Sequence, residues 1–581
     1  MSLTVILLAA CQDVFEPELE NNRDLTDAQT DPRFAQGILL NGYTRIPTNS
    51  WSFNDMATDD AVSSNETNQY YRMSTGEWSA IFNPGNPWSN AFTGIQFMNM
   101  VLSITDDVTY SRTEYINEMF KDRARGEAYG LRALFLYHLL QAHGGMANGQ
   151  LMGVPMFTEV QNAIETDFNQ PRKTFQECMT QLYDDIQKAT ELLPDDYKNI
   201  TSQDQVPEKY RSMGANQNDY NRAFGDDAKQ LLSGRIAKAV RAQAALLAAS
   251  PAFNPGSGTS WEKAADHAAE IIDLNGGLTG LPSAGVSWWI KTQVDLAVGG
   301  NNPPEVLWRG AVENNLTMEE SHFPPTLLGA GLLNPTQNLV DAFPMANGYP
   351  ISDQPNSGYL SSSPYAGRDP RLAAFIIYNG STFGTANTTV INTAADGTTN
   401  DALNKIETST RTGYYMRKLL RNEVNLNASS RNPQLHIKPR MRYTEFYLAY
   451  AEAANEAWGP TSTGTHAYSA YDVIKAIRRR AGVGVSNGDP YLESIKNNKD
   501  AMRELIRNER RLELCFEGYR FWDLRRWKKS LTESAKGDEI RGGVHNFFTV
   551  DPRVYQDFMI YGPVPNSEVL KFSALRQNTG W

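Results

Sequence analysis

The sequence predicts a mainly α-helical protein, in which a scaffold of helix pairs carries long irregular loops with short strands and hairpins. Two blocks of helical periodicity, one early and one late in the chain, predict the scaffold. The stretch between them is rich in Gly, Pro, Asn, Ser and Thr, which is typical of loops and turns. Paired helices of this length suggest stacked helix-turn-helix units like tetratricopeptide repeats, an α-α superhelix, although the sequence has no fixed period.

The N-terminal scaffold is expected to span residues 12–275, with an aromatic loop segment at residues 50–90. A stripe of small and apolar residues at three- and four-residue steps predicts the first long helix, which Gly144 and Gly145 end. Thr174 and Glu177 form a capping box at the start of the next helix, and Pro194 stops it. The helices predicted in this part cover residues 122–142, 174–193, 233–249 and 261–272.

Residues 276–439 are predicted to be loop-rich and associated with a ligand, with short strands such as Glu305–Trp308, whose Trp308 we assign to the core. Residues 440–581 form a C-terminal helical region. Its predicted helices cover residues 443–458, 467–481 and 499–516. We expect the three parts to form one compact unit.

The first residues suggest a lipid anchor. An apolar run of eight residues, too short to span a bilayer, ends in Leu8-Ala9-Ala10-Cys11, which resembles a lipobox. Residues 1–11 are therefore interpreted as a signal-peptide remnant with Cys11 as the lipidated residue; the alternative is an apolar start with a free thiol. No other segment has 18 consecutive apolar residues, so the protein is expected to be anchored rather than membrane-spanning.

Composition limits the classes of function. At 581 residues the chain can bury a large core, and its net charge of −12 argues against a nucleic-acid partner, because phosphate binding needs a cationic surface. The 26 Tyr and 11 Trp residues suit a sugar-binding face, but such residues are also common in cores. The three cysteines are far apart, so neither a zinc site nor a disulfide framework is indicated, and Cys178 and Cys515 are expected to be buried.

One strongly charged stretch has a structural and a functional interpretation. Residues 507–529 carry eight basic side chains, which could form a phosphate site, but acidic residues and an apolar stripe are interleaved with them. Arginine and glutamate offer each other planar, bidentate hydrogen bonds. We therefore expect these side chains to pair with each other inside the fold, with Glu452 as a partner of one of the arginines.

Several motifs in fixed order resemble the SusD/RagB family of outer-membrane nutrient-binding lipoproteins, of the starch-utilisation type. The motifs are Arg125–Ala133, Pro335–Phe343, Tyr447–Ala453, Glu509–Leu514, Phe516–Trp527 and Gly562–Glu568. The resemblance covers essentially the whole chain from Cys11. It implies a tetratricopeptide-like fold, glycan binding without catalysis or cofactor, and a SusC-like TonB-dependent β-barrel as partner. It also implies a lipid-anchored protein of the outer membrane that faces the cell exterior.

The sequence has no recognisable catalytic motif. HExxH, G-x-S-x-G and P-loop patterns are absent, and the seven histidines show no metal-ligand spacing. A pair of glycosidase carboxylates would leave no motif, so a glycoside hydrolase stays an alternative that the residues alone leave open.

Sugars are held by aromatic rings that lie flat on their C–H faces and by polar groups that bond their hydroxyls, often with water between. For each aromatic residue in the loops, core packing is an equally good interpretation. The candidates in the first loop segment are Trp51, Asp59, Asp60, Tyr70, Tyr71, Arg72, Trp78 and Trp88, and those in the middle segment are Trp288, Trp289, His322, Phe323 and Tyr349.

These observations predict a cell-surface glycan-binding lipoprotein that captures oligosaccharide or polysaccharide and delivers it to a SusC-like transporter. The alternative from another class is a structural or adhesive surface protein that docks other proteins and binds no sugar.

Overall fold

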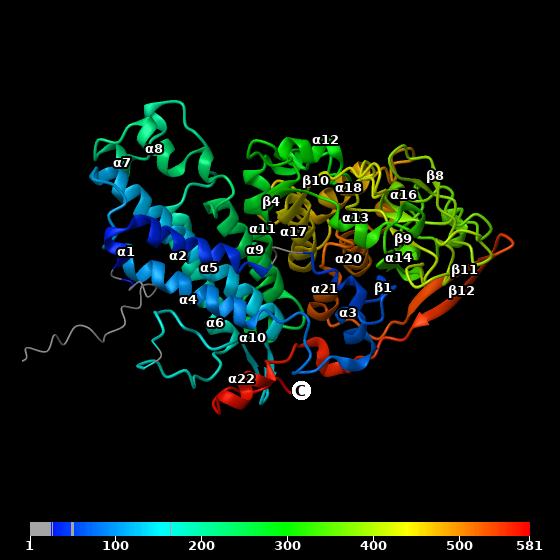
Figure 1. Cartoon of the computed structure of the whole chain (residues 1–581), viewed down its shortest axis with the longest axis horizontal. Helices are drawn as coiled ribbons and strands as arrows, with labels where there is room; N and C mark the ends of the chain where they lie inside the picture. The colour runs from blue at the N-terminus through cyan, green and yellow to red at the C-terminus, as the bar shows by residue number, and fades with distance from the viewer. Residues whose placement is uncertain (1–24, 26, 48–50, 163) are drawn as a thin grey trace, which may run out of the picture.

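The computed structural model describes residue 25 and residues 27–47, 51–162 and 164–581 (Figure 1). Helices make up most of its regular structure, and the strands are short and form only two-stranded sheets. The mainly α-helical prediction is therefore confirmed. Among the described residues no helix is both long and apolar enough to cross a membrane. Cys11 and the predicted signal-peptide remnant, residues 1–11, lie outside the described residues.

The scaffold is a succession of helices in which each packs on the next. Contacts join α2 to α4, α4 to α5, α5 to α6, α6 to α9, α9 to α11, and α11 to α17, which also contacts α18 and α20. The early and late helical blocks therefore form one scaffold (Figure 1). Its helices are α2 (Pro32–Thr44), α4 (Trp88–Ile104), α5 (Glu114–His143), α6 (Phe175–Leu192), α9 (Gly234–Ala249), α11 (Trp261–Leu274), α17 (Tyr443–Trp458), α18 (Ala470–Arg480) and α20 (Lys499–Glu513).

The capping signals in the sequence place the helix ends correctly. The Thr174 and Glu177 capping box is formed in both directions at the start of α6. Gly144 caps α5, and the Ser233 hydroxyl accepts a hydrogen bond from the Ile236 amide in the first turn of α9. Helices α2 and α4 were not predicted, and α4 begins at Trp88, which places that residue in a helix rather than in the loop segment.

Three hydrophobic cores hold the fold together. The first lies among α4, α5, α6 and α9, and it includes Cys178. The second lies under the loop-rich part of the chain and includes Cys515 and most of the loop aromatics. The third joins α9, α11 and α17 through buried alanines such as Ala249, Ala268 and Ala451, which let the helix backbones approach closely. The predicted burial of both cysteines is confirmed.

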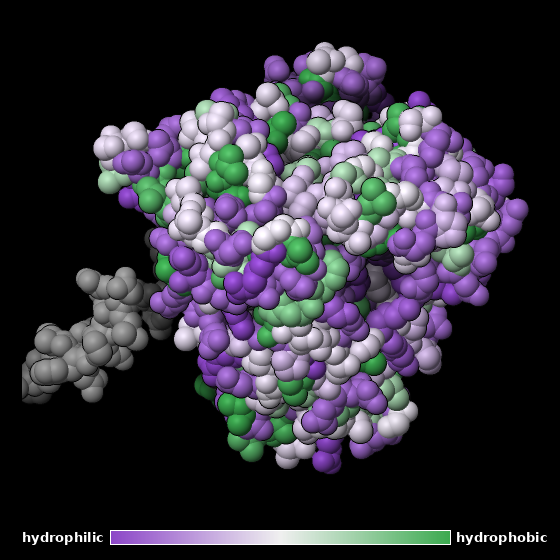
Figure 2. All heavy atoms as spheres, turned by 90° about the vertical axis from the view of Figure 1, so that its right-hand side faces the viewer, coloured by the Kyte–Doolittle hydropathy of each residue, from purple (hydrophilic) through white to green (hydrophobic). Residues whose placement is uncertain are grey.

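The loop-rich part lies at one end of the molecule (Figure 1). Strand β4 (Val306–Asn315) pairs antiparallel with β10 (Gln434–Arg442), and β11 (Ala535–Arg541) pairs with β12 (Val544–Asp551) in a long hairpin. Figure 2 views this end, where hydrophilic and near-neutral residues cover most of the face and hydrophobic residues form scattered spots. The other short strands are β1 (Ala61–Ser63), β2 (Gly145–Ala147), β3 (Gln150–Met152), β5 (Leu333–Pro335), β6 (Ile376–Ile377), β7 (Thr382–Phe383), β8 (Thr389–Val390) and β9 (Tyr415–Met416).

Short helices connect these elements. They are α1 (Asp27–Thr30), α3 (Gln69–Arg72), α7 (Glu208–Arg211), α8 (Gln217–Phe224), α10 (Asn254–Ser257), α12 (Lys291–Val294), α13 (Thr317–His322), α14 (Gln337–Ala342), α15 (Gln354–Ser357), α16 (Pro370–Phe375), α19 (Pro490–Ile495), α21 (Arg520–Arg526) and α22 (Asn566–Lys571).

Most of the basic stretch at residues 507–529 is part of the interior, and Lys528 and Lys529 at its end are exposed. Arg526 makes a bidentate pair with Glu452, with N···O distances of 2.5 and 2.7 Å, which confirms the partner predicted for that glutamate. Arg510 and Arg526 also pair with Asp523, each at 2.8 Å. Other members pair outside the stretch, which the sequence did not indicate: Arg511 bonds Asp59 and Asp60, and Arg520 bonds Asp59.

A second group of buried charges joins the loop-rich part to the scaffold. Arg371 at the start of α16 is 1 % exposed and pairs with Asp369 at 2.7 Å, Glu509 at 2.9 Å and Glu513 at 3.1 Å. Arg478 of α18 bonds the other Glu509 oxygen at 2.8 Å. Because every one of these groups is buried, each depends on its partners for compensation.

A glycine in α4 tests the helix packing. A Cβ at Gly94 would lie 2.5 Å from two ring carbons of the buried Phe135, which is too close for any contact. We expect Gly94→Ala to lower the free energy of unfolding by about 1–3 kcal/mol, as overpacking does. Gly37→Ala in α2 is the matched control, because nothing lies within 4 Å of its Cβ, and it should raise stability by about 0.5–1 kcal/mol. Urea unfolding measures both variants, and a change in the free energy of unfolding with the same sign in both would contradict this packing.

Candidate functional site

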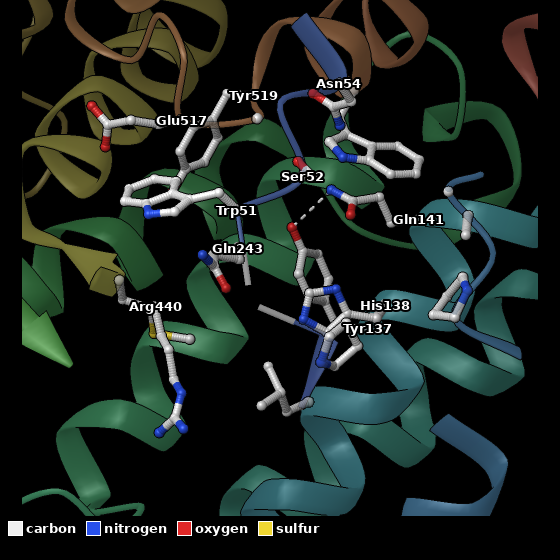
Figure 3. A pocket seen from close by; sticks show the side chains of 18 of the residues that line it. Trp51, Ser52, Asn54, Tyr137, His138, Gln141, Gln243, Arg440, Glu517 and Tyr519 are labelled. Carbon is white, nitrogen blue, oxygen red and sulfur yellow. Dashed lines mark hydrogen bonds between the residues drawn. The ribbon is translucent and has the colours of Figure 1, made fainter. Parts of the chain in front are cut away.

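A cleft of about 290 Å³ lies where the scaffold meets the loop-rich part of the chain (Figure 3). The segment that follows residue 50, the second half of α5 and strand β10 form its walls. Its lining includes Trp51, Ser52, Asn54, Tyr70, Pro84, Gly85, Asn86, Asn90, Tyr137, His138, Gln141, Gln243, Trp308, Lys438, Pro439, Arg440, Glu517, Tyr519 and Trp522.

Two half-buried tryptophans line the cleft, Trp51 and Trp522. The Trp51 indole stacks on Phe53 and on Trp288, with ring centroids 6.0 and 6.5 Å apart, so its orientation is fixed from behind. Trp522 is held by Phe521, whose ring centroid lies 5.3 Å away. Figure 3 shows Trp51 beside Tyr519, with Tyr137 and His138 across the opening.

Polar groups around the rings are partly fixed and partly unpartnered. Tyr519 Oη and Gln243 Nε2 each donate to Glu445 at 2.8 Å. The Gln141 amide donates to Tyr137 Oη at 3.1 Å (Figure 3). Among the described residues, Asn54 Oδ1 and His138 Nε2 are buried atoms without a hydrogen-bond partner. Such atoms are rare in folded proteins and are explained where a ligand or water satisfies them.

Charge in the cleft comes mainly from β10. Lys438 and Arg440 both line the cleft, and the pairing of β10 with β4 shifts register on either side of the intervening Pro439. Lys438 Nζ lies 5.3 Å from the Trp51 ring centroid, and the Arg440 guanidinium carbon lies 4.5 Å from that of Trp308. Burial lowers the pKa of Lys438 to about 7, helped by the charge of Arg440, and burial lowers the pKa of Arg440 to about 10. Both effects are those of cations taken partly out of water.

Glu517 is the one carboxylate among the described residues that line the cleft. It accepts hydrogen bonds from Arg442 at 2.7 and 2.9 Å and from Lys418 at 2.6 Å. Its charge is therefore already compensated by two cations. On the opposite wall, burial lowers the pKa of His138 to about 4, so this imidazole is neutral near pH 7.

Of the thirteen candidates from the sequence, Trp51 and Tyr70 line this cleft. Trp288 and Trp289 lie behind Trp51 and border a much smaller cavity with it. The rings of five candidates are almost fully buried in the cores, with exposed fractions of at most 7 %. These five are Trp78, Trp88, Trp288, Trp289 and Phe323. Trp88 packs in the first core from the start of α4, and the other four pack in the second core under the loop-rich part, so none offers an open ring face.

The polar candidates Asp59, Asp60 and His322 are also buried and contact other residues inside the fold. Asp59 and Asp60 are buried ion-pair partners of Arg511, and His322 is 2 % exposed and tilted against Phe53. Three other candidates are half-buried but do not line the cleft. Tyr71 lies under Arg411, Arg72 pairs with Glu77, and Tyr349 packs on Tyr491.

Sequence reasoning missed several cleft residues. Trp522 and Tyr519 belong to a motif that was interpreted only as structural, and Gln243 lies in a helix. The basic pair that flanks Pro439 was the one available signal, because Lys438 and Arg440 stand together at the end of the loop-rich stretch.

Comparison with known proteins agrees with this fold. The model of the SusD family matches residues 305–581, and a second model, described as starch-binding associating with outer membrane, matches residues 34–207. The chain belongs to the SusD family. Two SusD-like proteins of Formosa agariphila are similar to it, one 35 % identical over 91 residues and the other 31 % over 140 residues. The matches cover 16 % and 24 % of this chain, and only 17 % and 24 % of those relatives.

Solved structures of SusD-like proteins share the fold over almost the whole chain. A SusD-like protein of Bacteroides fragilis superposes with a TM-score of 0.71 at 22 % identity, over 97 % of this chain and 99 % of that one. A second protein of B. fragilis, described as a SusD-like carbohydrate binding protein, gives 0.67 at 20 % identity over 94 % and 99 %. A laminarin binding SusD-like protein gives 0.54 at 18 % identity over 94 % and 99 %. At these identities the likeness establishes the fold.

Proposed function

We propose that the cleft binds a glycan. The observation that carries this proposal is the pairing of two half-buried tryptophans, Trp51 and Trp522, with buried polar atoms that have no hydrogen-bond partner among the described residues. A hexose ring has an apolar face, which stacks on an indole ring. It also carries hydroxyl groups, which can form hydrogen bonds with such unpartnered polar atoms. Membership of the SusD family supports the same function, since solved members include carbohydrate binding proteins.

The glycan is captured and released unchanged. Hydrolysis of a glycosidic bond needs two carboxylates about 5–10 Å apart, one of them free to act as acid or nucleophile. Glu517 is the one carboxylate among the described lining residues, and its oxygens already accept hydrogen bonds from Arg442 and Lys418. Reducing ends that appear when the protein is incubated with its polysaccharide would contradict this part of the proposal.

Capture takes place at the outer membrane, where Cys11 carries the lipid anchor, and a SusC-like TonB-dependent barrel receives the glycan at the cell exterior. Support comes from the matching description, starch-binding associating with outer membrane, and from the broad helical scaffold. We expect the protein to co-purify with such a barrel from membranes solubilised in mild detergent. A clean monomer under those conditions would count against the partner.

Truncation of the two tryptophans tests the cleft. We expect Trp51→Ala with Trp522→Ala to weaken retention on the cognate polysaccharide about 5–150-fold, because each ring supplies stacking of about 0.5–1.5 kcal/mol. Affinity gel electrophoresis measures the retention. Tyr349→Ala is the matched control, since this half-buried ring does not line the cleft. Unchanged retention in the double variant would remove the two tryptophans from the site, and binding to no glycan on an array would favour a protein-docking function.

A further inference from the structure

We propose that the ligand of this cleft is an anionic glycan, whose carboxylate or sulfate groups are held at Lys438 and Arg440. The proposal rests on the proposed glycan-binding function and names the class of sugar. It follows from the placement of the two cations, from the supply of counter-charge around Lys438 and from the charge of the whole chain.

The first step is geometric. Lys438 and Arg440 both lie on β10, and both line the cleft. Lys438 Nζ is 5.3 Å from the centroid of Trp51, the ring proposed to stack on sugar. A negative group on a sugar stacked at Trp51 would therefore lie within reach of the ammonium. Arg440 lines the same cleft, with its guanidinium carbon 4.5 Å from the Trp308 ring centroid. Its planar fork matches the oxygens of either a carboxylate or a sulfate.

The second step concerns counter-charge. Among the described residues no carboxylate lies within 4.0 Å of Lys438 Nζ, and the ammonium makes a cation–π contact with Trp51. Glu517, the carboxylate of the cleft lining, is already taken by Arg442 and Lys418. A half-buried cation without a counter-ion costs free energy, and an anionic ligand removes that cost when it binds.

The third step is the contrast with the rest of the protein. The chain has a net charge of −12, with 66 acidic against 54 basic residues. An overall negative charge repels a polyanion at long range, so a site for one needs a local concentration of positive charge. The described cleft lining has two cations from β10 and a single carboxylate that is paired elsewhere. This excess of positive charge in the cleft favours an anionic glycan over a neutral one.

An array of neutral, uronate-bearing and sulfated polysaccharides separates the outcomes. Laminarin and dextran serve as neutral probes, polygalacturonate and alginate as uronates, and dextran sulfate and carrageenan as sulfate esters. We expect binding among the uronates or the sulfates, and the two arms tell carboxylate from sulfate. Binding to neutral probes alone would overturn the anionic ligand while leaving glycan binding intact. Binding to no probe would remove the proposed function and this inference together.

Substitution of the lysine tests the residue itself. With the anionic probe that binds, Lys438→Met should weaken affinity about 10–100-fold, the usual worth of a charge-assisted contact, and Lys438→Arg should retain most of it. Lys475→Met is the matched control, because this exposed lysine on α18 does not line the cleft. Circular dichroism confirms that each variant folds. An unchanged affinity in folded Lys438→Met, or an equal loss in Lys475→Met, would overturn the role of Lys438.

Discussion

Replacement of Arg371 by methionine should lower the free energy of unfolding by about 3–5 kcal/mol, or prevent folding altogether. The side chain is 1 % exposed and bonds three buried carboxylates, Asp369, Glu509 and Glu513, at 2.7–3.1 Å. Methionine fills much of the volume but leaves these carboxylates with too little positive charge. A buried charge without compensation is among the most destabilising changes known. Urea unfolding followed by circular dichroism measures the loss.

Two further variants identify the cause of that loss. Arg541→Met removes an arginine whose side chain is 60 % exposed and pairs with Glu539, so it should change stability by less than about 1 kcal/mol. Arg371→Met combined with Glu509→Gln and Glu513→Gln removes positive and negative charge together and should recover part of the loss. A loss below 1 kcal/mol in Arg371→Met alone would show that the group does not need its arginine.

Affinity for an anionic glycan should fall as the pH rises through 7. Burial lowers the pKa of Lys438 to about 7, so the free cleft loses this positive charge between pH 6 and 9. An anionic ligand favours the protonated amine and raises its pKa, so binding takes up a proton above pH 7. The dissociation constant should rise about tenfold per pH unit above 7. It should level off after a total rise of about 10–100-fold, which is the whole contribution of the charged Lys438 contact to affinity. Isothermal titration calorimetry in buffers of pH 5.5–9 measures it.

Among the described residues that line the cleft, the other groups with a shifted pKa do not change charge in this range. Burial lowers the pKa of His138 on α5 to about 4, and Arg440 stays protonated below about pH 10. Burial raises the pKa of Tyr70 to about 12, and it raises that of Tyr137 and Tyr519 well above the ordinary tyrosine value.

Lys438→Arg is the control for the pH effect, because an arginine stays protonated throughout and its binding should be flat from pH 5.5 to 9. A neutral glycan should likewise bind the native protein with no slope. If the native protein binds an anionic glycan with no slope above pH 7, Lys438 does not hold the charged group.

The helical scaffold could be predicted from the sequence because its signals are local. Thr174 with Glu177, Gly144 and Ser233 each satisfy backbone groups within one turn, so their effect does not depend on distant parts of the chain. Helix α4 gave no such signal. It is apolar on most sides and Pro87 precedes it without a side-chain cap, so its burial between α2 and α5 had to come from tertiary packing.

The cleft could be predicted only in part. Trp51 and Tyr70 are on the lining, but most of the other aromatic candidates are buried in the second core. Composition shows that the loops contain aromatic residues. Whether those residues are buried depends on whether the loop-rich stretch is long enough to form its own core, and in this protein it is. The cations of β10 were not found, because their position opposite Trp51 depends on contacts between segments almost 400 residues apart.

Strand β10 continues directly into α17, and Arg442 at the junction is fixed by Glu305 at 2.6 Å and Glu517 at 2.7 Å. The positive side of the cleft is therefore rigidly attached to the scaffold, whereas Trp51 comes from a separate surface segment. Ring stacking and charge selection thus reside in different stretches of the polypeptide. A related protein could therefore keep the stacking residues and change only the charged residues of β10. Such a local change would alter the preference from acidic to neutral sugars on the same scaffold.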